Sequence, residues 1–271
     1  MEIITLASGS SGNCALVRAG SGSEQTTILL DAGIAMRTAR ELADSIGCNL
    51  ATIDAVLLTH AHADHCAKVV ALAARANAPL WAHPDSLHPR SAASVAEIER
   101  RKVEHRPFQS GVEFHIGNIK ILPVLLDHDS EPTHGFIFTH GGIKAGFFTD
   151  TGITDALTTD LMSALDILVL ESNHDPEMLA NGRYPWHLKQ RVGGDRGHLS
   201  NQQAAEVLAH RVSSRLRLLA LAHLSDKNNT KNIALSTAQQ ALSARGLDIT
   251  PQIAPKRGIL QLSLEPVANF S

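Results

Sequence analysis

The strongest constraint in this sequence is the short run from Thr59 to His65, which holds three histidines and one aspartate. The apolar, β-branched residues 53–58 before the run predict a buried strand. The alanine-rich residues 66–76 after it contain neither glycine nor proline and predict a helix. The run therefore occupies a tight turn between the end of a strand and the start of a helix.

The polar side chains of this turn are candidate metal ligands: His60, His62, Asp64 and His65. His60 and His62 alternate, so an extended backbone directs both side chains the same way. Asp64 and His65 lie where the chain turns, and we expect them to face a second ion close by. Imidazole and carboxylate groups together suit divalent zinc, manganese or iron. A polar surface loop is the alternative, but closely spaced histidines repel one another when protonated.

Length and charge limit what kind of protein this is. The chain has 271 residues, of which 44% are hydrophobic, and its formal net charge is -3 at pH 7. This is enough apolar material for a core, and we expect residues 1–271 to form one domain because no linker or composition break divides them. The near-neutral charge argues against a broad basic surface, although a local basic strip for nucleic acid is compatible with it.

Cysteine use and hydropathy indicate the compartment. The three cysteines, Cys14, Cys48 and Cys66, are scattered and odd in number, so they predict no disulfide framework and favour the cytoplasm. Cys66 abuts the histidine run, but we interpret it as a small buried helix residue rather than a ligand. No apolar stretch is long enough to span a bilayer, so we expect no membrane partner.

Residues that bind metals or protons recur where predicted strands end. The strands concerned are predicted at residues 26–30, 53–58, 119–126, 146–148, 167–170 and 217–222. The residues at or just after their ends are Asp31, His60, His128, Asp150, Glu171 and His223. His134 competes with His128, but the strand end gives His128 a fixed direction. Convergence of these strand ends on one rim is what a site on packed sheets requires, and Asp31 is placed to brace a ligating histidine.

Further helices and turns follow from capping and turn residues. Helices are predicted at residues 35–46, 154–164 with Thr154 as the N-cap, 200–212 and 233–244. The Gly/Ser-rich residues 8–13 predict a hairpin turn, and its backbone amides together with Asn13 are suited to hold a phosphate. Residues 83–106 are polar and mixed in charge, and their pattern predicts no element.

Two local features favour contact with an anion. One short glycine-containing span carries the basic residues Arg183, Lys189, Arg191 and Arg196. This span is either a solvated loop or a cationic strip that meets phosphates. His198 comes just before a helix whose start is marked by the capping-box pair Ser200 and Gln203. A helix N-terminus is a favourable place to meet an anion, so His198 is a candidate for that contact.

The ordered set of candidate ligands resembles the metallo-β-lactamase fold superfamily over nearly the whole chain. The matching residues, in chain order, are Asp31, His60, His62, Asp64, His65, His128, Asp150 and His223. The resemblance implies an α/β (α+β) fold class, namely a four-layer αββα sandwich with the site along one edge of the two sheets. It also implies two divalent ions, the first held by His60, His62 and His128. The second is held by Asp64, His65 and His223, with Asp150 bridging the two.

Three local stretches make the chain similar to nucleases of that superfamily. Residues 171–173, Glu-Ser-Asn, resemble the acidic motif of the phosphodiesterase branch, and residues 197–200, Gly-His-Leu-Ser, resemble the loop of tRNA 3′-processing nucleases. Residues 8–13, together with residues 171–175 and 221–225, most closely resemble the YycJ/WalJ group of small bacterial 5′→3′ DNA exonucleases. The intervals between His128, Asp150 and His223 leave no room for a tRNA-binding arm or for a β-CASP cap domain.

The resemblance implies a metal-dependent phosphodiesterase in which a hydroxide held between two ions attacks phosphorus. We expect a 5′→3′ exonuclease that acts on DNA more readily than on RNA, with its oligomeric state open. The residues predicted to take part in catalysis are Asp64, Glu171 and His198. The residues predicted to bind substrate are Asn13, Lys189, Arg191, Arg196 and Ser200.

Two other functions compete with this prediction. A small-molecule metallohydrolase, acting on a thiolester, a lactone or a cyclic phosphodiester, uses the same ligands and explains the near-neutral charge. It does not explain the stretches around Glu171 and His198. A non-catalytic metal-binding protein is disfavoured, because a closed structural site needs neither so many ligands nor an open position.

Overall fold

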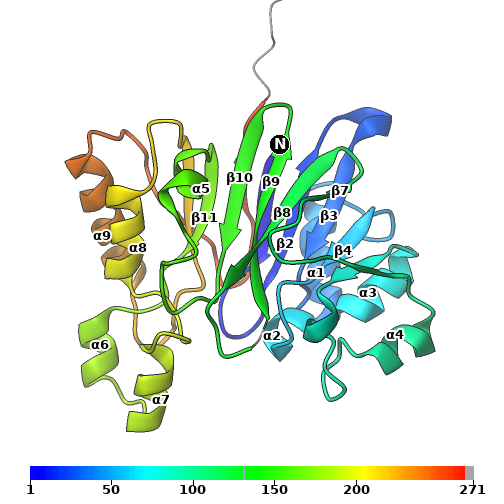
Figure 1. Cartoon of the computed structure of the whole chain (residues 1–271), viewed down its shortest axis with the longest axis horizontal. Helices are drawn as coiled ribbons and strands as arrows, with labels where there is room; N and C mark the ends of the chain where they lie inside the picture. The colour runs from blue at the N-terminus through cyan, green and yellow to red at the C-terminus, as the bar shows by residue number, and fades with distance from the viewer. Residues whose placement is uncertain (131, 266–271) are drawn as a thin grey trace, which may run out of the picture.

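Two seven-stranded sheets lie face to face at the centre of the computed structural model, which describes residues 1–130 and 132–265 (Figure 1). The first sheet has, in spatial order, β14 (Leu260–Ser263), β1 (Glu2–Ala7), β2 (Cys14–Ala19), β3 (Thr26–Leu30), β4 (Ala55–Leu57), β5 (Leu80–Ala82) and β6 (His105–Pro107). The second has β13 (Gln252–Ile253), β12 (Leu218–Ala222), β11 (Ile167–Glu171), β10 (Ile143–Phe148), β9 (Thr133–His140), β8 (Ile119–Leu126) and β7 (Phe114–Ile116).

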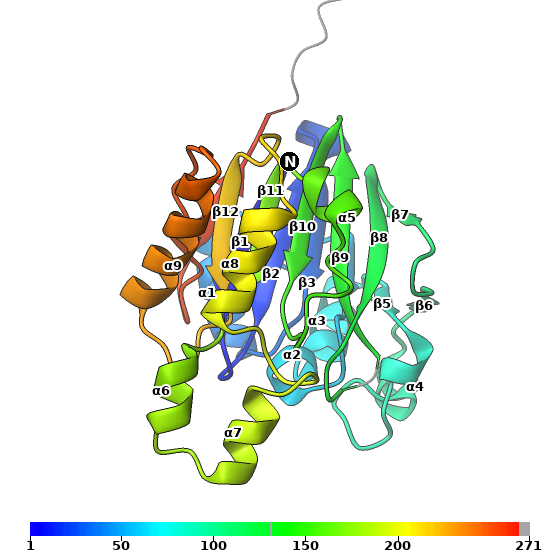
Figure 2. The same cartoon turned by 60° about the vertical axis from the view of Figure 1, so that its left-hand side comes forward.

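Helices cover the outer face of each sheet (Figures 1 and 2). On the first sheet these are α1 (Met36–Ser45), α2 (Ala63–Cys66), α3 (Val69–Ala76) and α4 (Val95–Arg101). On the second they are α5 (Thr159–Ser163), α8 (Asn201–His210) and α9 (Lys231–Ala244), while α6 (Pro176–Asn181) and α7 (Trp186–Val192) extend beyond the sheet. The fold is the predicted four-layer αββα sandwich.

Three apolar clusters hold the four layers together. The central cluster lies between the sheets and includes the fully buried rings of Phe136 and Phe138 on β9. The other two lie between each sheet and its helices. Strands β3 and β11 are buried along their whole length, which explains why their sequences are apolar without alternation. The division into layers therefore follows from which faces of the elements are apolar.

Parallel pairing brings the functional strand ends to one rim. Strand β3 pairs in parallel with β4, and the register places Leu30 opposite Leu57. Strands β10, β11 and β12 are parallel to one another, with Glu171 opposite Ala222. Because the carboxyl ends of parallel strands lie at the same edge, the residues that follow these strands meet there. The convergence expected from the sequence is a consequence of this register.

The helix predicted at residues 66–76 begins three residues later than expected, and a separate short helix occupies the predicted turn before it. α2 begins directly after His62 and ends at Cys66, and α3 begins at Val69. Between them the Lys68 amide donates to the carbonyl of Ala32, in the turn after β3, at 2.8 Å. This bond ties the metal-binding turn to the first sheet. Helix propensity alone does not reveal it.

The helix start predicted at Thr154 is wrong. Helix α5 begins at Thr159 with Thr158 as its N-cap. Thr154 instead receives hydrogen bonds from the Arg211 guanidinium, to its carbonyl and, at 3.0 Å, to its hydroxyl. A side chain distant in sequence therefore holds this segment in an irregular conformation. The sequence does contain a threonine that caps this helix, but it is Thr158 rather than Thr154.

Besides α6, two segments form helices that the sequence pattern did not predict. Residues 83–106 include a 3-10 turn (Pro84–Ser86) and helix α4, whose N-cap Ser94 accepts from the Glu97 amide. The basic span after β11 includes α7, none of whose residues is buried, while Arg183 and Arg196 lie outside this helix. A contact of the span with phosphates stays a prediction. Both helices are short and mostly polar, which explains their weak sequence signal. None of the helices in the described residues is both long and apolar enough to cross a membrane.

Removing a ring from the inter-sheet cluster tests the packing of the fold. We expect Phe138→Ala to lower the free energy of unfolding by about 3–5 kcal/mol, because the buried cavity cannot collapse between two sheets. Leu125→Ala on the neighbouring β8 is a matched control, since that side chain is 52% exposed. Urea denaturation followed by circular dichroism measures both, and equal losses in the two variants would contradict the proposed core.

Candidate metal centre

Three of the strand-end residues have an unusual backbone conformation. Asp31, Asp150 and His223 follow β3, β10 and β12 with φ angles of 56°, 64° and 57°. This left-handed region is uncommon for residues other than glycine, and such positions cluster at functional sites. Each side chain is fixed at the rim of the sandwich and buried there.

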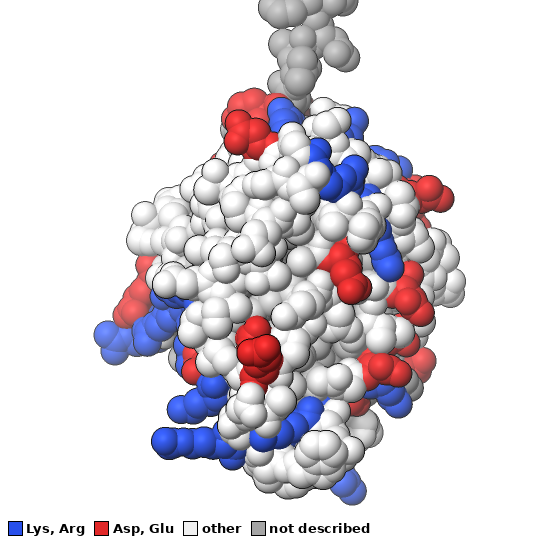
Figure 3. All heavy atoms as spheres, turned by 90° about the vertical axis from the view of Figure 1, so that its left-hand side faces the viewer, with Lys and Arg blue, Asp and Glu red and all other residues white. Residues whose placement is uncertain are grey.

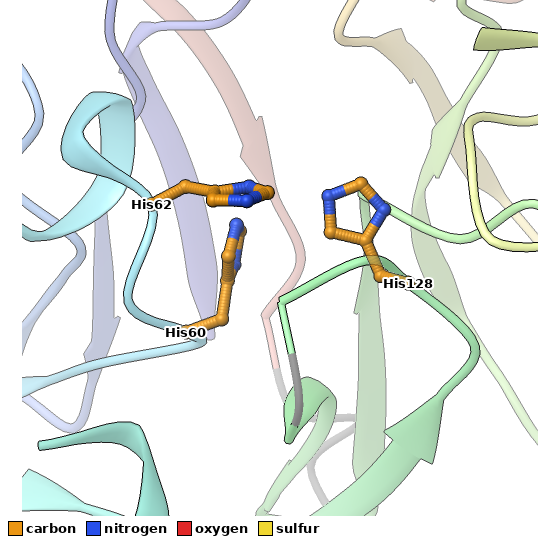
Figure 4. Close-up of side chains that lie close together, drawn as sticks. All are labelled: His60, His62 and His128. Atoms are coloured by element: carbon orange, nitrogen blue, oxygen red, sulfur yellow. The ribbon is translucent and has the colours of Figure 1, made fainter. Parts of the chain in front are cut away.

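The first group of candidate ligands consists of three histidines from both sheets. Figure 4 shows the rings of His60 and His62, which follow β4, facing the ring of His128, which follows β8. One ring nitrogen from each lies within 4.8 Å of the others, and His60 and His128 are buried. The structure thus brings His128 to this cluster. His134 instead contacts Ser110, with 2.7 Å between its Nε2 and the serine hydroxyl.

The second group lies beside the first and shares Asp150 with it. Asp64, His65 and His223 also offer ligand atoms within 4.8 Å of one another. The Asp150 carboxylate lies 3.2 Å from His65 Nε2 and 3.6 Å from His223 Nε2. On its other side it lies 3.9 Å from Nε2 of His128. Asp150 therefore stands between the two groups, as a bridging ligand would.

Hydrogen bonds at Nδ1 fix the orientation of the buried rings. The Nδ1 contacts are His60 with the Thr59 hydroxyl at 3.0 Å, His65 with the Asp31 carboxylate at 2.7 Å, His128 with the Gly197 carbonyl at 2.9 Å and His223 with the Glu171 carboxylate at 3.0 Å. A ring that donates from Nδ1 presents the lone pair of Nε2. As neutral rings that donate from Nδ1, all four would turn an acceptor nitrogen toward the centre of the site.

Several of these inward atoms are buried without a hydrogen-bond partner. They are Nε2 of His60, His128 and His223 and Oδ2 of Asp150. A buried polar atom without a partner is unfavourable by about 1–3 kcal/mol, so four in one place require an explanation. Divalent cations would satisfy all four, and a mixed imidazole and carboxylate set suits zinc, manganese or iron. The residues present therefore fit metal ions.

The electrostatics of the site are those of buried, closely coupled groups. Burial lowers the pKa of both His60 and His128, which favours the neutral rings that bind metals. Burial alone would raise the pKa of Asp150, but His223 and His65 hold it well below its usual value. Burial also opposes the charged form of His223, yet Asp150, Asp64 and Glu171 raise its pKa to about 10. The carboxylates thus favour positive charge at the centre.

Asp31 braces the metal-binding turn from behind. Its carboxylate accepts from the Thr59 amide at 2.9 Å and from the Thr59 hydroxyl at 2.8 Å, in addition to His65 Nδ1. One buried side chain therefore orients both ends of the turn, at Thr59 and at His65. The close approach also needs Gly33, because a Cβ there would lie 1.6 Å from the carbonyl oxygen of Asp64.

Glu171 lies behind two histidines rather than in the cleft. Its Oε1 accepts from Nδ1 of His223 at 3.0 Å and from Nδ1 of His198 at 2.9 Å. Its Oε2 accepts from the amides of Thr151 and Leu199. Burial opposes ionisation, but His198 and His223 lower the pKa of Glu171 to about 2. Glu171 is fully buried, so it positions His198 and His223 instead of touching a substrate.

A cleft of about 320 Å³ opens over these groups. Among the residues expected to take part in catalysis or to bind substrate, Asp64, His198 and Arg191 line it. Arg191 reaches across the cleft to Asp129, with Nε 2.5 Å from Oδ2. Arg196 donates to the carbonyl of His128 at 3.2 Å and is not among the lining residues. Lys189 lies outside the lining, and its Nζ donates to the carbonyl of Ala180.

Two other residues expected to bind substrate lie deeper. Asn13 is buried, and its amide nitrogen is 2.8 Å from Nε2 of His65, next to the second ligand group. The Ser200 hydroxyl accepts from the Gln203 amide and so completes the capping box of α8. Neither side chain lines the cleft. A role for them in substrate binding stays a prediction.

Sequence reasoning missed three groups that shape the site. Thr59 and the carbonyl of Gly197 hold His60 and His128 at Nδ1. Asp129 lies 3.3 Å from His62 Nε2 and also anchors Arg191. Asp129 directly follows His128, and that adjacency was its only signal. A backbone carbonyl has no sequence signal at all.

Comparison with known proteins shows which protein family the chain belongs to. The Beta-lactamase superfamily domain family matches residues 26–219, so the chain belongs to the beta-lactamase superfamily. The structure is similar to YhfI, a metallo-beta-lactamase fold protein from Bacillus subtilis, with a TM-score of 0.70 over 96% of this chain and 99% of that one. At 17% identity that likeness shows the fold alone.

Two curated proteins are more similar in sequence. The exodeoxyribonuclease YycJ of Bacillus anthracis is 29% identical over 255 residues, which cover 92% of each chain. The exodeoxyribonuclease WalJ of Streptococcus pneumoniae is 30% identical over 244 residues, which cover 90% of this chain and 89% of that protein. The resemblance to the YycJ/WalJ group expected from the sequence is thereby confirmed.

Replacing the bracing carboxylate tests whether it controls metal affinity. We expect Asp31→Asn to weaken zinc binding by about 10–100-fold, because its amide cannot accept from His65 and Thr59 together. Competition with a chromophoric chelator measures the affinity. Asp85→Asn is the control, since that carboxylate is 81% exposed. An unchanged affinity in Asp31→Asn would contradict the bracing role.

Proposed function

We propose that this chain is a metal-dependent phosphodiesterase, and specifically a 5′→3′ DNA exonuclease. The observation that carries the proposal is the pair of ligand groups joined by Asp150, with His198 at the edge of the same cleft. Two relatives of matching length bear the name exodeoxyribonuclease, which supports DNA as the substrate. RNA is the competing substrate, and the test below separates the two.

The ligand roles follow from the two groups. We assign His60, His62 and His128 to one divalent ion and Asp64, His65 and His223 to the other, with Asp150 shared between them. When bound, such ions act as Lewis acids that activate water and neutralise charge on phosphoryl oxygens. Zinc, manganese and iron are all compatible with these donors.

Because both sheets supply ligands, we also propose that the described part of the chain acts as one domain.

His198 has the position of a proton donor. Its Nδ1 contacts Glu171, while the ring lines the cleft and is partly exposed. With Nδ1 turned to Glu171, the imidazolium form of the ring carries its other proton at Nε2. Hydrolysis at the 5′ end releases a 3′-oxygen that must gain a proton, and we assign that transfer to His198. Glu171 acts through His198 as a positioning residue.

The cleft also supplies groups for the strand next to the reacting phosphate. Arg191 is held on its wall by Asp129, and a guanidinium suits phosphate contact.

We place the protein in the cytoplasm, because Cys14, Cys48 and Cys66 are all buried and free.

One assay separates the candidate activities. Metal-loaded protein is incubated with end-labelled single- and double-stranded DNA and RNA, with and without a 5′ phosphate, and with a thiolester and a bis-aryl phosphodiester. We expect nucleotides to be released progressively from the 5′ end of DNA. Hydrolysis of the thiolester with no action on any nucleic acid would instead support the small-molecule hydrolase.

Single substitutions separate the metal ligands from the proton donor. We expect Asp150→Ala to abolish nuclease activity by disrupting both ligand groups. His198→Ala should lower turnover about 10²–10⁴-fold while metal content stays at the wild-type level. Metal analysis and steady-state kinetics on the same samples measure both effects. Full activity in metal-loaded His198→Ala would remove the assigned role.

A further inference from the structure

Asp129 lies in the metal cleft but belongs to neither of the two ligand groups. It directly follows His128, and its side chain is 27% exposed. A carboxylate that is mostly withdrawn from water is unfavourable unless it meets a cation or hydrogen-bond donors. The groups that face its two oxygens therefore indicate what this residue does.

The first oxygen of Asp129, Oδ1, faces the first ligand group, which consists of His60, His62 and His128. It lies 3.3 Å from Nε2 of His62 and 3.4 Å from Nε2 of His128. Nδ1 of His128 contacts the Gly197 carbonyl, so the neutral ring has a lone pair at Nε2, and this atom is buried without a hydrogen-bond partner. A carboxylate oxygen and a lone pair repel each other unless a cation lies beside them. Oδ1 therefore adds negative charge where the first ligand group meets the cleft.

The second oxygen of Asp129, Oδ2, holds a cation from a distant part of the chain. Nε of Arg191, on α7, donates to Oδ2 at 2.5 Å. The bond joins the segment after β8 to a helix residue that comes 62 positions later. A guanidinium has five N–H donors, so a bond through Nε leaves the donors of both Nη atoms for an anion. Asp129 thus fixes the direction of Arg191 and leaves it able to bind a phosphate.

Arg191 differs from the other cations at this end of the molecule. On the face that carries α8 and α9, several Lys and Arg side chains gather toward the lower edge, where α6 and α7 lie (Figures 2 and 3). Among the described residues, Arg191 is the one Lys or Arg that lines the metal cleft. Lys189 on the same helix instead donates from Nζ to the carbonyl of Ala180. Pairing with Asp129 therefore distinguishes the cation that reaches the metal centre.

We propose that Asp129 is a positioning residue that couples the first metal ion to Arg191. Its Oδ1 strengthens the binding of that ion, and its Oδ2 directs the guanidinium toward a substrate phosphate at the same ion. The inference rests on the proposed nuclease function and extends it, because it assigns the phosphate contact to a charged pair rather than to Arg191 alone. An arginine already held through Nε loses less side-chain freedom when it meets a phosphate.

Zinc binding tests the part of this proposal that concerns the ion, independently of catalysis. Metal-free protein is titrated with zinc in competition with a chromophoric chelator. We expect Asp129→Asn to weaken the binding of one of the two ions about 10–100-fold, because the amide carries no charge. Arg191→Gln should bind both ions as tightly as the wild type or more tightly, since it removes a positive charge from the same place. Wild-type zinc affinity in Asp129→Asn would overturn the role of Asp129 at the ion.

Steady-state kinetics on zinc-saturated samples test the coupling to Arg191. We expect Arg191→Gln to raise KM for DNA hydrolysis about tenfold, with a smaller change in kcat, because a charge-assisted hydrogen bond to phosphate is lost. Asp129→Asn should raise KM by a similar factor. The double variant should raise KM no further than Arg191→Gln alone, since both substitutions disrupt one contact. Effects that multiply in the double variant would overturn the coupling.

Glu41→Gln is the matched control, because Glu41 accepts from Nε of Arg37 at 2.7 Å in a similar pair outside the cleft lining. Its zinc affinity and its KM should equal those of the wild type. A wild-type chain that binds zinc but hydrolyses no nucleic acid would overturn the proposed function, and the phosphate contact of Arg191 with it. The zinc titration would still decide the role of Asp129 at the ion.

Discussion

Hydrogen bonds from imidazole Nδ1 atoms to buried acceptors are the interaction on which the site depends. They turn Nε2 of His60, His65, His128 and His223 toward one point. The acceptors come from the turns after β3 and β4, from the end of β11 and from the loop before α8. Both sheets must therefore be packed before the ligands are oriented. A metal centre of this kind is a property of the whole sandwich.

The same arrangement concentrates unfavourable features at the rim. Residues in the left-handed conformation, buried carboxylates and ring nitrogens without hydrogen-bond partners lie close together in space at this rim. The left-handed residues and the unpartnered atoms are unfavourable for the fold, and the apolar layers must offset them. They are instead what a cation requires, because each supplies a lone pair or a negative charge in a fixed direction. The metal-binding rim thus concentrates features that are unfavourable for folding alone.

Much of this could be predicted from the sequence, because the main signals are local. Apolar strands followed by His128, Asp150 or His223 predict ligands on a common rim, and the strand before Asp31 predicts a carboxylate that braces one of them. The structure brings all four residues to that rim. Other features depend on contacts that no local pattern carries. The acceptor for His128 is a backbone carbonyl, at Gly197. Thr154 does not start a helix, because the guanidinium of Arg211, the residue after α8, donates a hydrogen bond to it.

The most direct test is anomalous X-ray diffraction from crystals of the zinc-loaded protein. Two anomalous peaks are predicted, one among His60, His62 and His128 and the other among Asp64, His65 and His223, with Asp150 between them. Ions bound elsewhere, or no peak among these side chains, would contradict a metal centre at this rim. A single peak would contradict the two-ion site.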